Sequence, residues 1–239
     1  MNDSKCQTNC NGCPAFSNSI FNRIDHKSTD FLAEQKVVTH YKKGETIFHQ
    51  GTPSFGVYCI GQGKVKLSKV NAAGGETIFL IAPSGKLTGY QDHVHQSEYL
   101  TTATVLENTS ACFLSNDVLT HLILTQPSVA INLLQQTVAS METSLSYGHA
   151  STHMSAKNRV ASLVLNLGKN FGIEMDGKIK IDIRLTRHEM ASMVGTASET
   201  MIRSLTELKQ LGILEQEGNY LMITDMNKLH HLSISSHSY

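Results

Sequence analysis

The chain has 239 residues, of which 40% are hydrophobic, and its 20 Lys and Arg residues balance its 20 Asp and Glu residues. It can bury a core in one large or two modest domains, and its zero net charge neither supports nor excludes nucleic-acid binding. No apolar run is long enough for a membrane span, and the polar N-terminus lacks the apolar core of a signal peptide. We therefore expect a cytoplasmic protein whose five cysteines are reduced, metal-bound or catalytic rather than paired in disulfides.

Residues 1–19 form a leader that contains three of the five cysteines. Cys6, Cys10 and Cys13 fall close together, in a stretch without a periodic apolar pattern. Thiolates are good ligands for soft metals, so three of them can meet on one ion or cluster. From these residues alone, a zinc site, an iron–sulfur cluster and a leader without metal all remain open.

Residues 20–116 predict a β domain. A short helix is expected over residues 20–32. Seven short runs of strand-forming residues then alternate with glycine turns, which is typical of a β-sandwich or barrel. Residues 71–75 have the composition of a hairpin tip. Cys59 lies in one of the runs and is expected in the core, and Cys112 lies in the last run.

A long helix is expected over residues 117–147. Its apolar residues recur at the a and d positions of a heptad and form a narrow seam, namely Ile131, Leu134, Val138, Met141 and Leu145. Such a seam suits one partner helix, and we expect it to pair with the same helix of a second copy. The alternative is that the seam lies against the β domain. Residues 148–156 interrupt the pattern and are expected to form a hinge.

Residues 157–239 contain the pattern of a winged helix-turn-helix. A helix (157–167) and a strand (178–183) precede the segment 185–214, which predicts two short helices joined by a tight turn. A hairpin through Gly218 and Asn219 follows as the wing, and the tail from residue 229 is polar. Its His230 and His231 are expected at the surface rather than in a metal site.

Both helices of the pair carry a start signal. Thr186 with Glu189, and Thr196 with Glu199, fit the capping box, in which the two side chains satisfy free backbone N–H groups. The second helix has an apolar stripe on one face and hydrogen-bonding side chains on the other. A helix of this kind, supported by a short helix, is the arrangement that reads the major groove of DNA.

These features together resemble the CRP/FNR family of bacterial transcription regulators. The resemblance covers residues 20–228 and is specific in KGETIFHQG (43–51), GQGKVKL (61–67), NRVASLVLNL (158–167) and the segment 185–214. It implies an α+β fold with an N-terminal β-roll sensor domain like those that bind cyclic nucleotides, a long dimerisation helix and a C-terminal winged helix-turn-helix. It also implies an effector-controlled homodimer that binds a palindromic promoter site in double-stranded DNA and acts with RNA polymerase.

The family's recognition-helix Glu and Arg fall on Glu199 and Arg203. Arg203 would donate to guanine O6 and N7, Glu199 would accept from cytosine N4, and Ile202 would touch a thymine methyl. Alternatively, Glu199 and Arg203 form only a surface ion pair. The candidate DNA-binding residues are Ser198, Glu199, Ile202, Arg203, Thr196 and Thr186.

The resemblance leaves three effectors to weigh. The cyclic-AMP branch needs a Gly-Glu-Leu turn and an Arg, but this chain has Gly85-Lys86-Leu87 and no Arg or Lys between residues 87 and 156, which argues against cyclic AMP. The FNR branch holds a [4Fe–4S] cluster, which senses oxygen or nitric oxide. It uses three N-terminal cysteines and one at the end of the β domain. The matching residues are Cys6, Cys10, Cys13 and Cys112, although the leader spacing is C-x3-C-x2-C rather than C-x2-C-x5-C.

The third effector option is haem bound through His93 or His95. The alternative to cluster control is the same dimeric regulator with a different effector, haem or a small molecule, or with constitutive activity. The chain shows no nucleophile–base arrangement, Gly-rich phosphate loop or HExxH motif. We therefore expect it not to be an enzyme.

Overall fold

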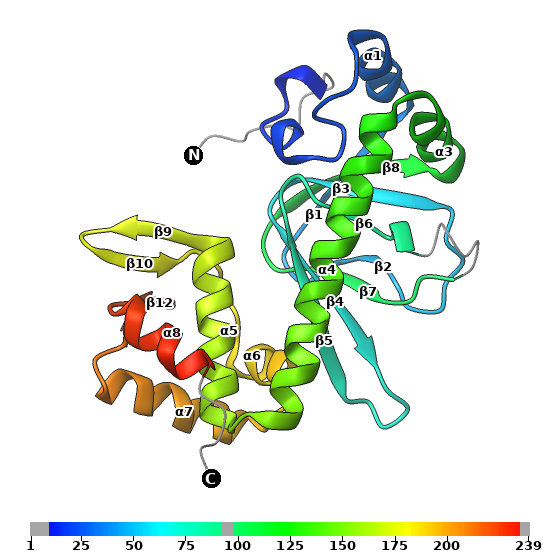
Figure 1. Cartoon of the computed structure of the whole chain (residues 1–239). Helices are drawn as coiled ribbons and strands as arrows, with labels where there is room; N and C mark the ends of the chain where they lie inside the picture. The colour runs from blue at the N-terminus through cyan, green and yellow to red at the C-terminus, as the bar shows by residue number, and fades with distance from the viewer. Residues whose placement is uncertain (1–9, 92–97, 235–239) are drawn as a thin grey trace. The chain divides into compact units, whose positions relative to one another are not determined.

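The computed structural model describes residues 10–91 and 98–234 (Figure 1). The chain divides into two compact units, Met1–Glu142 and Thr143–Tyr239, and the boundary falls within one long helix. Within the described ranges, no helix combines the length and the apolar character needed to cross a membrane.

The first unit is built on two four-stranded antiparallel sheets, which confirm the expected β-roll. The strand order of one sheet is β1 (Val37–Tyr41), β8 (Thr109–Ser115), β3 (Gly56–Gln62) and β6 (Leu87–Thr88). The order of the other sheet is β2 (Thr46–Phe48), β7 (Thr102–Val105), β4 (Lys64–Val70) and β5 (Glu76–Pro83). The predicted hairpin tip joins β4 to β5, where Asn71 Oδ1 accepts from the backbone N–H groups of Ala73 and Gly75.

Stacked aromatic rings fill part of the β-roll interior. The ring centroid of Phe48 lies 4.1 Å from that of Tyr99 and 5.6 Å from that of Tyr58. The buried Tyr99 hydroxyl donates to the carbonyl oxygen of Gly56 at 2.8 Å. Burial raises the pKa of Tyr58 to about 12, because the phenolate would lose its hydration.

Helical segments gather at one end of the β-roll (Figure 1). They are η1 (Cys10–Gly12), η2 (Phe16–Asn18), α1 (His26–Gln35), α3 (Asn116–Thr125) and the start of α4 (Pro127–His153). The predicted helix over residues 20–32 is wrong at its start. Helix α1 begins at His26, because Asp25 is its N-cap and accepts from the backbone N–H of Ser28 at 2.7 Å. Ile20 and Phe21 are buried in the turns before it.

The long helix expected over residues 117–147 is two helices, α3 and α4. Proline disfavours a helical conformation in the residue before it, and Gln126, before Pro127, has an extended backbone with φ −127° and ψ 90°. Helix α4 then continues to His153, beyond the expected hinge start at residue 148. The break before the next helix lies at Met154 and Ser155, and Ser155 caps that helix.

The second unit is the expected winged helix-turn-helix. Its helices are α5 (Ala156–Phe171), α6 (Arg187–Val194), α7 (Ser198–Gln210) and α8 (Met226–Ile234). Its sheet has the order β11 (Leu214–Glu217), β12 (Tyr220–Ile223), β10 (Lys178–Ile181) and β9 (Gly172–Met175).

Two elements of this unit were missed from the sequence. Strand β9 joins β10 through Asp176 and Gly177, whose φ values of +49° and +74° suit a two-residue hairpin turn. Part of the polar tail forms helix α8, which is anchored by the fully buried Leu229, while His230 and His231 are exposed.

Candidate DNA-reading helix and cysteine pocket

Helix α6 begins and ends as its sequence predicts. The capping box is complete: Thr186 Oγ1 accepts from the backbone N–H of Glu189 at 3.1 Å, and the Glu189 carboxylate accepts from the backbone N–H of Thr186 at 2.8 Å. At the other end, Gly195 adopts the left-handed conformation (φ 63°, ψ 49°), which glycine allows without strain. These two local signals fix the short helix that supports α7.

The second predicted capping box is wrong. The N-cap of α7 is Ala197, which offers no side-chain hydrogen bond, so Thr196 lies one residue too early to cap. The Glu199 carboxylate is therefore not used in a cap. It is exposed in the first turn of α7, where the positive end of the helix dipole favours a negative charge.

Helix α7 separates a buried back from an exposed front. Its buried side chains are Met201, Ser204, Leu205 and Leu208. On the front, Glu199 and Arg203 are exposed and Ile202 is 50% exposed. Since residues three and four apart share a helix face, these three side chains form one exposed surface on the front of α7. The ion pairs of the described structure do not include one between Glu199 and Arg203.

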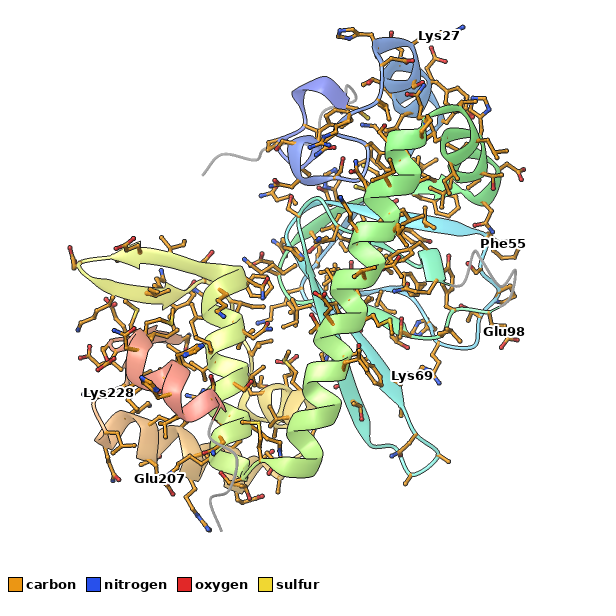
Figure 2. All side chains as sticks on the ribbon, in the orientation of Figure 1. Lys27, Phe55, Lys69, Glu98, Glu207 and Lys228 are labelled. Atoms are coloured by element: carbon orange, nitrogen blue, oxygen red, sulfur yellow. The ribbon has the colours of Figure 1, made fainter. Side chains whose placement is uncertain are left out.

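The remaining candidate DNA-binding residues lie around the start of α7. Ser198 and Thr196 are half-buried, and Thr186 is exposed but uses its hydroxyl in the capping box. Further along α7, Glu207 forms an ion pair with Lys157 of α5 at 3.6 Å, and Glu207 is labelled in Figure 2. That pair lies beyond the predicted contact surface.

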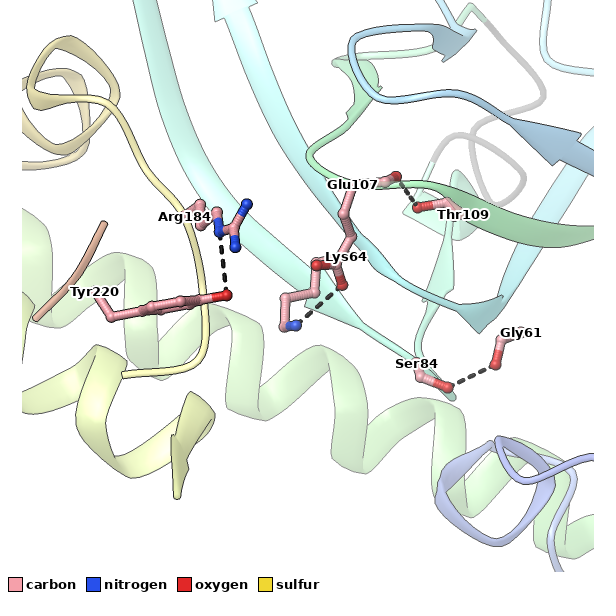
Figure 3. Close-up of polar contacts among 7 residues, drawn as sticks. All are labelled: Gly61, Lys64, Ser84, Glu107, Thr109, Arg184 and Tyr220. Carbon is pink, nitrogen blue, oxygen red and sulfur yellow. Dashed lines mark hydrogen bonds and ion pairs between the residues drawn. The ribbon is translucent and has the colours of Figure 1, made fainter. Parts of the chain in front are cut away.

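Cations that sequence reasoning did not single out surround the wing. Arg184 Nε donates to the Tyr220 hydroxyl at 3.1 Å (Figure 3), and Lys180 Nζ lies 4.1 Å from the centre of the same ring. Arg187 and Lys209 both donate to the Gln216 side-chain oxygen, at 3.1 and 2.6 Å. Burial, together with the Arg187 charge, lowers the pKa of Lys209. These cations lie where the wing strands meet the helices, and a phosphate backbone would attract them.

Four cysteines line a single pocket in the first unit. Cys10 and Cys13 come from the leader, and Cys59 and Cys112 come from neighbouring strands β3 and β8. The pocket is partly open to solvent. The rest of its lining is largely apolar, namely Ala15, Phe16, Ser19, Phe21, Leu32, Lys36, Gly61 and Leu114.

This pocket brings together three of the four predicted cluster ligands, Cys10, Cys13 and Cys112, and adds Cys59. Cys6 lies outside the described residues, as do His93 and His95. Cys59 was expected only in the core, and its place opposite Cys112 depends on strand register, which no local pattern reveals. In the described part of the chain, no three Cys, His, Asp or Glu side chains are close enough to hold one metal ion. The four thiols that line the pocket are nevertheless of the donor type that an iron–sulfur cluster takes.

A row of polar side chains on α4 connects this region to the long helix. Asn132 Nδ2 donates to the carbonyl oxygen of Ile20 at 2.9 Å, and Ser128 Oγ donates to that of Arg23 at 3.2 Å. The buried Gln136 side chain accepts from the backbone N–H of Leu87 and donates to its carbonyl oxygen, at 3.2 and 2.9 Å. The row therefore holds the segment that follows the leader and strand β6.

The loop before β6 also touches the leader. Gly85 (φ +90°) packs so closely on Asn18 that an added Cβ would lie 2.8 Å from the Asn18 Cβ atom. In the same loop, Ser84 Oγ donates to the carbonyl oxygen of Gly61 at 2.7 Å (Figure 3). The turn that resembles a nucleotide-binding turn is thus packed against the leader and the cysteine pocket.

The predicted seam is exposed on α4. Its five residues are 46–64% exposed, and they are Ile131, Leu134, Val138, Met141 and Leu145. With about 100° per residue, the seam lies on the side of α4 opposite the polar row. In the described chain this apolar row is therefore not buried against the β domain.

Two family models match the chain. A cyclic nucleotide-binding domain matches residues 38–126, and a Crp-like helix-turn-helix domain matches residues 158–232. The first match covers the two sheets, and the second covers most of the winged helix-turn-helix unit.

Curated relatives align over most of their length. The CRP-like cAMP-activated global transcriptional regulator of Mycobacterium tuberculosis is 24% identical over 210 residues, 88% of this chain and 94% of the relative. The anaerobic regulatory protein of Haemophilus influenzae is 24% identical over 227 residues, 94% of this chain and 87% of the relative. The transcriptional activator protein FnrA of Stutzerimonas stutzeri is 27% identical over 184 residues, 77% of this chain and 75% of the relative.

Solved structures share the fold. FixK2 from Bradyrhizobium japonicum has a TM-score of 0.72 at 20% identity, covering 84% of this chain and 99% of its own. A CooA mutant from Carboxydothermus hydrogenoformans has a TM-score of 0.73 at 19% identity, covering 85% and 90%. With both domains matched in order and with regulators aligned over most of its length, the chain belongs to the CRP/FNR family of transcription regulators.

Proposed function

We propose that this regulator binds a palindromic DNA site as a homodimer and that the state of its cysteine pocket controls this binding. The observation that carries the DNA part is the exposed face of α7, with Glu199, Ile202 and Arg203 above a buried back. Two copies related by a two-fold axis would present two such helices about one DNA turn apart. As a transcription regulator, the dimer would act next to RNA polymerase.

The exposed seam of α4 supports the dimer. A row of five large apolar side chains at heptad spacing is typical of a helix that pairs with a second helix. Leu134→Glu places a charge in the seam and should convert the dimer to a monomer in analytical ultracentrifugation, with a matching loss of DNA affinity. Leu124→Glu is the matched control, because Leu124 is 77% exposed but lies on α3. A Leu134→Glu variant that stays dimeric would contradict this interface.

We further propose that the pocket holds a [4Fe–4S] cluster through cysteines of the leader and Cys112. The supporting observation is that cysteines from segments far apart in the chain line one pocket with a largely apolar lining. When bound, such a cluster supplies irons that take thiolate ligands, and its loss in oxygen or nitric oxide is the signal. The anaerobic regulatory relatives make this effector the leading candidate.

The residues around the pocket provide a route from the leader to the seam. Cys10 and Cys13 of the leader line the pocket together with Cys112 of β8. The segment that follows the leader is bonded to α4, because the carbonyl oxygens of Ile20 and Arg23 accept from its side chains. A leader released from the pocket would loosen these bonds and the position of α4. Because the seam lies on the other side of the same helix, dimer stability and leader order are coupled.

Anaerobic purification tests the cluster. We expect a coloured protein with iron and sulfide that binds DNA tightly, and that loses iron, dimer and DNA affinity together in air. A colourless, iron-free anaerobic protein that binds DNA tightly would refute cluster control. Replacing Cys6, Cys10 and Cys13 together with Ser should then weaken anaerobic DNA binding. An unchanged affinity would favour the alternative of another effector or constitutive activity.

Cyclic AMP is not the effector under this proposal. Aromatic rings fill part of the β-roll interior, and the segment from residue 87 to 156 contributes no Arg or Lys to hold a phosphate. Titration calorimetry of the apoprotein with cyclic AMP should show no binding, and DNA affinity should not respond to the nucleotide. Micromolar binding would reverse this assignment.

A further inference from the structure

The floor of the cysteine pocket is a pair of cysteines on adjacent strands. Cys59 of β3 is directly opposite Cys112 of β8 in the antiparallel register. Directly opposite residues on one face of a sheet have Cβ atoms about 4.5–5.5 Å apart. Alternate residues share a face, and Leu114, two positions from Cys112, lines the same pocket, as does Gly61 at the irregular end of β3. Gly61 has no side chain and so leaves room beside Cys59.

The roof of the pocket is the first turn of the described leader. Cys10 and Cys13 stand at the two ends of a tight turn, in which the backbone N–H of Cys13 donates to the Cys10 carbonyl oxygen at 3.1 Å. Cys10 is buried, and its sulfur accepts from Lys36 Nζ at 3.2 Å. Lys36 directly follows α1, and its positively charged side chain forms part of the pocket wall.

We propose that Cys59 is a cluster ligand and that Cys10, Cys13, Cys59 and Cys112 together supply the four protein thiolates. This inference rests on the proposed [4Fe–4S] site. Each of the four irons takes one protein thiolate, so the four cysteines that line the pocket are sufficient. Two ligands then come from the leader and two from the sheet. The cluster bridges the leader to two adjacent strands rather than to one.

Lys36 completes the site electrostatically. Four thiolates leave the bound cluster with a net negative charge, and a largely apolar wall gives it little other compensation. The Lys36 ammonium beside Cys10 supplies an opposite charge at the pocket wall. Removing it should favour the oxidised, less negative cluster and therefore lower the reduction potential.

Single alanine variants of the full chain, reconstituted anaerobically with ferrous iron and sulfide, test the ligand set. Iron and acid-labile sulfide per protomer are measured, with Mössbauer spectra of the bound iron. Wild type and Cys6→Ala should hold a full cluster, whereas Cys59→Ala and Cys112→Ala should lose it or retain a smaller one. A Cys59→Ala variant with full iron content and a wild-type spectrum would overturn the inference while leaving the proposed cluster intact. Wild type without iron would overturn both.

Alkylation of the wild-type protein tests the same ligand set without using variants, which can fold poorly. Anaerobic iodoacetamide treatment followed by peptide mass spectrometry should label Cys6 and spare Cys59 in the loaded protein, and should label both after iron removal and unfolding. The opposite protection pattern would reject Cys59 as a ligand. Circular dichroism of the iron-free Cys59→Ala protein checks that the β-roll is retained.

The potential of the bound cluster tests its place beside Lys36. Lys36→Met should lower the midpoint potential in an anaerobic redox titration. Lys27→Met, which removes an exposed lysine from α1, should leave the potential unchanged. An equal potential in wild type and Lys36→Met would contradict the placement of the cluster in this pocket.

Discussion

The exposed face of α7 and the cysteine pocket are built in opposite ways. The three side chains at the centre of the α7 face lie within five consecutive positions, and helical geometry alone puts them together. The pocket takes its four cysteines from the leader, from β3 and from β8, and only strand register brings Cys59 opposite Cys112. Changes on the α7 face should therefore alter binding and spare folding, whereas changes at the pocket act through tertiary structure.

The largest expected effect contrasts a buried leucine of α7 with the exposed leucine that directly follows the helix. Leu208 is completely buried and Leu211, at the helix end, is 51% exposed. Leu208→Ala should lower the free energy of unfolding of the DNA-binding unit by about 2–5 kcal/mol, because it leaves a cavity. Leu211→Ala should change it by less than about 0.5 kcal/mol. Urea denaturation followed by circular dichroism measures both, and equal losses would mean that the back of α7 is not the packed face.

Removing Arg203 should affect binding without affecting folding. Arg203→Ala deletes a bidentate donor and should weaken binding to a site selected from random DNA by wild type by about 1–3 kcal/mol per half-site, roughly 5- to 150-fold. Arg23→Ala is the matched control, since it removes an exposed arginine from the first unit. Fluorescence anisotropy with specific and scrambled DNA checks the result. A loss that is equal on both DNAs would show that Arg203 contacts phosphate and not bases.

The two threonines before the helices of the pair provide a matched test of local stability. Thr186→Ala removes a formed capping box and should cost about 1 kcal/mol of unfolding free energy. Thr196→Ala removes a residue that does not cap and should cost less than about 0.5 kcal/mol. Thermal unfolding of the two variants at the same pH compares them. A larger loss for Thr196→Ala would restore the capping box expected at α7.

The smallest effect concerns the N-cap of α1. Its hydrogen bond from the backbone N–H of Ser28 lowers the pKa of Asp25 below its usual 3.8. The stabilisation from this ionised cap is complete above the unfolded pKa and is lost as the pH falls through the folded value. Asp25→Asn should therefore reduce the pH dependence of stability below about pH 4. Denaturation midpoints measured at several acidic pH values test this, and parallel curves for the two proteins would contradict it.

Local sequence signals located the elements but not all of their ends. The first helix of the pair could be placed closely, because its start and stop signals act on neighbouring residues. Its start is set by Thr186 with Glu189, and its end is set by Gly195. The predicted helix over residues 117–147 failed because its apolar period continues across Pro127, whose effect on Gln126 breaks the backbone. Strand β9 has four exposed residues and therefore no alternation of buried and exposed side chains to detect.

By itself, the sequence determined the order of a β domain and a winged helix-turn-helix, the two helices of that motif and the apolar seam, because each depends on periodicity and on turn chemistry between near neighbours. Only the tertiary structure decided which of the four described cysteines meet at one pocket. It set Cys59 beside Cys112 through the register of two strands, and it brought the leader turn with Cys10 and Cys13 over them. Register and the docking of a leader depend on contacts between distant segments, which the local pattern around a cysteine cannot encode.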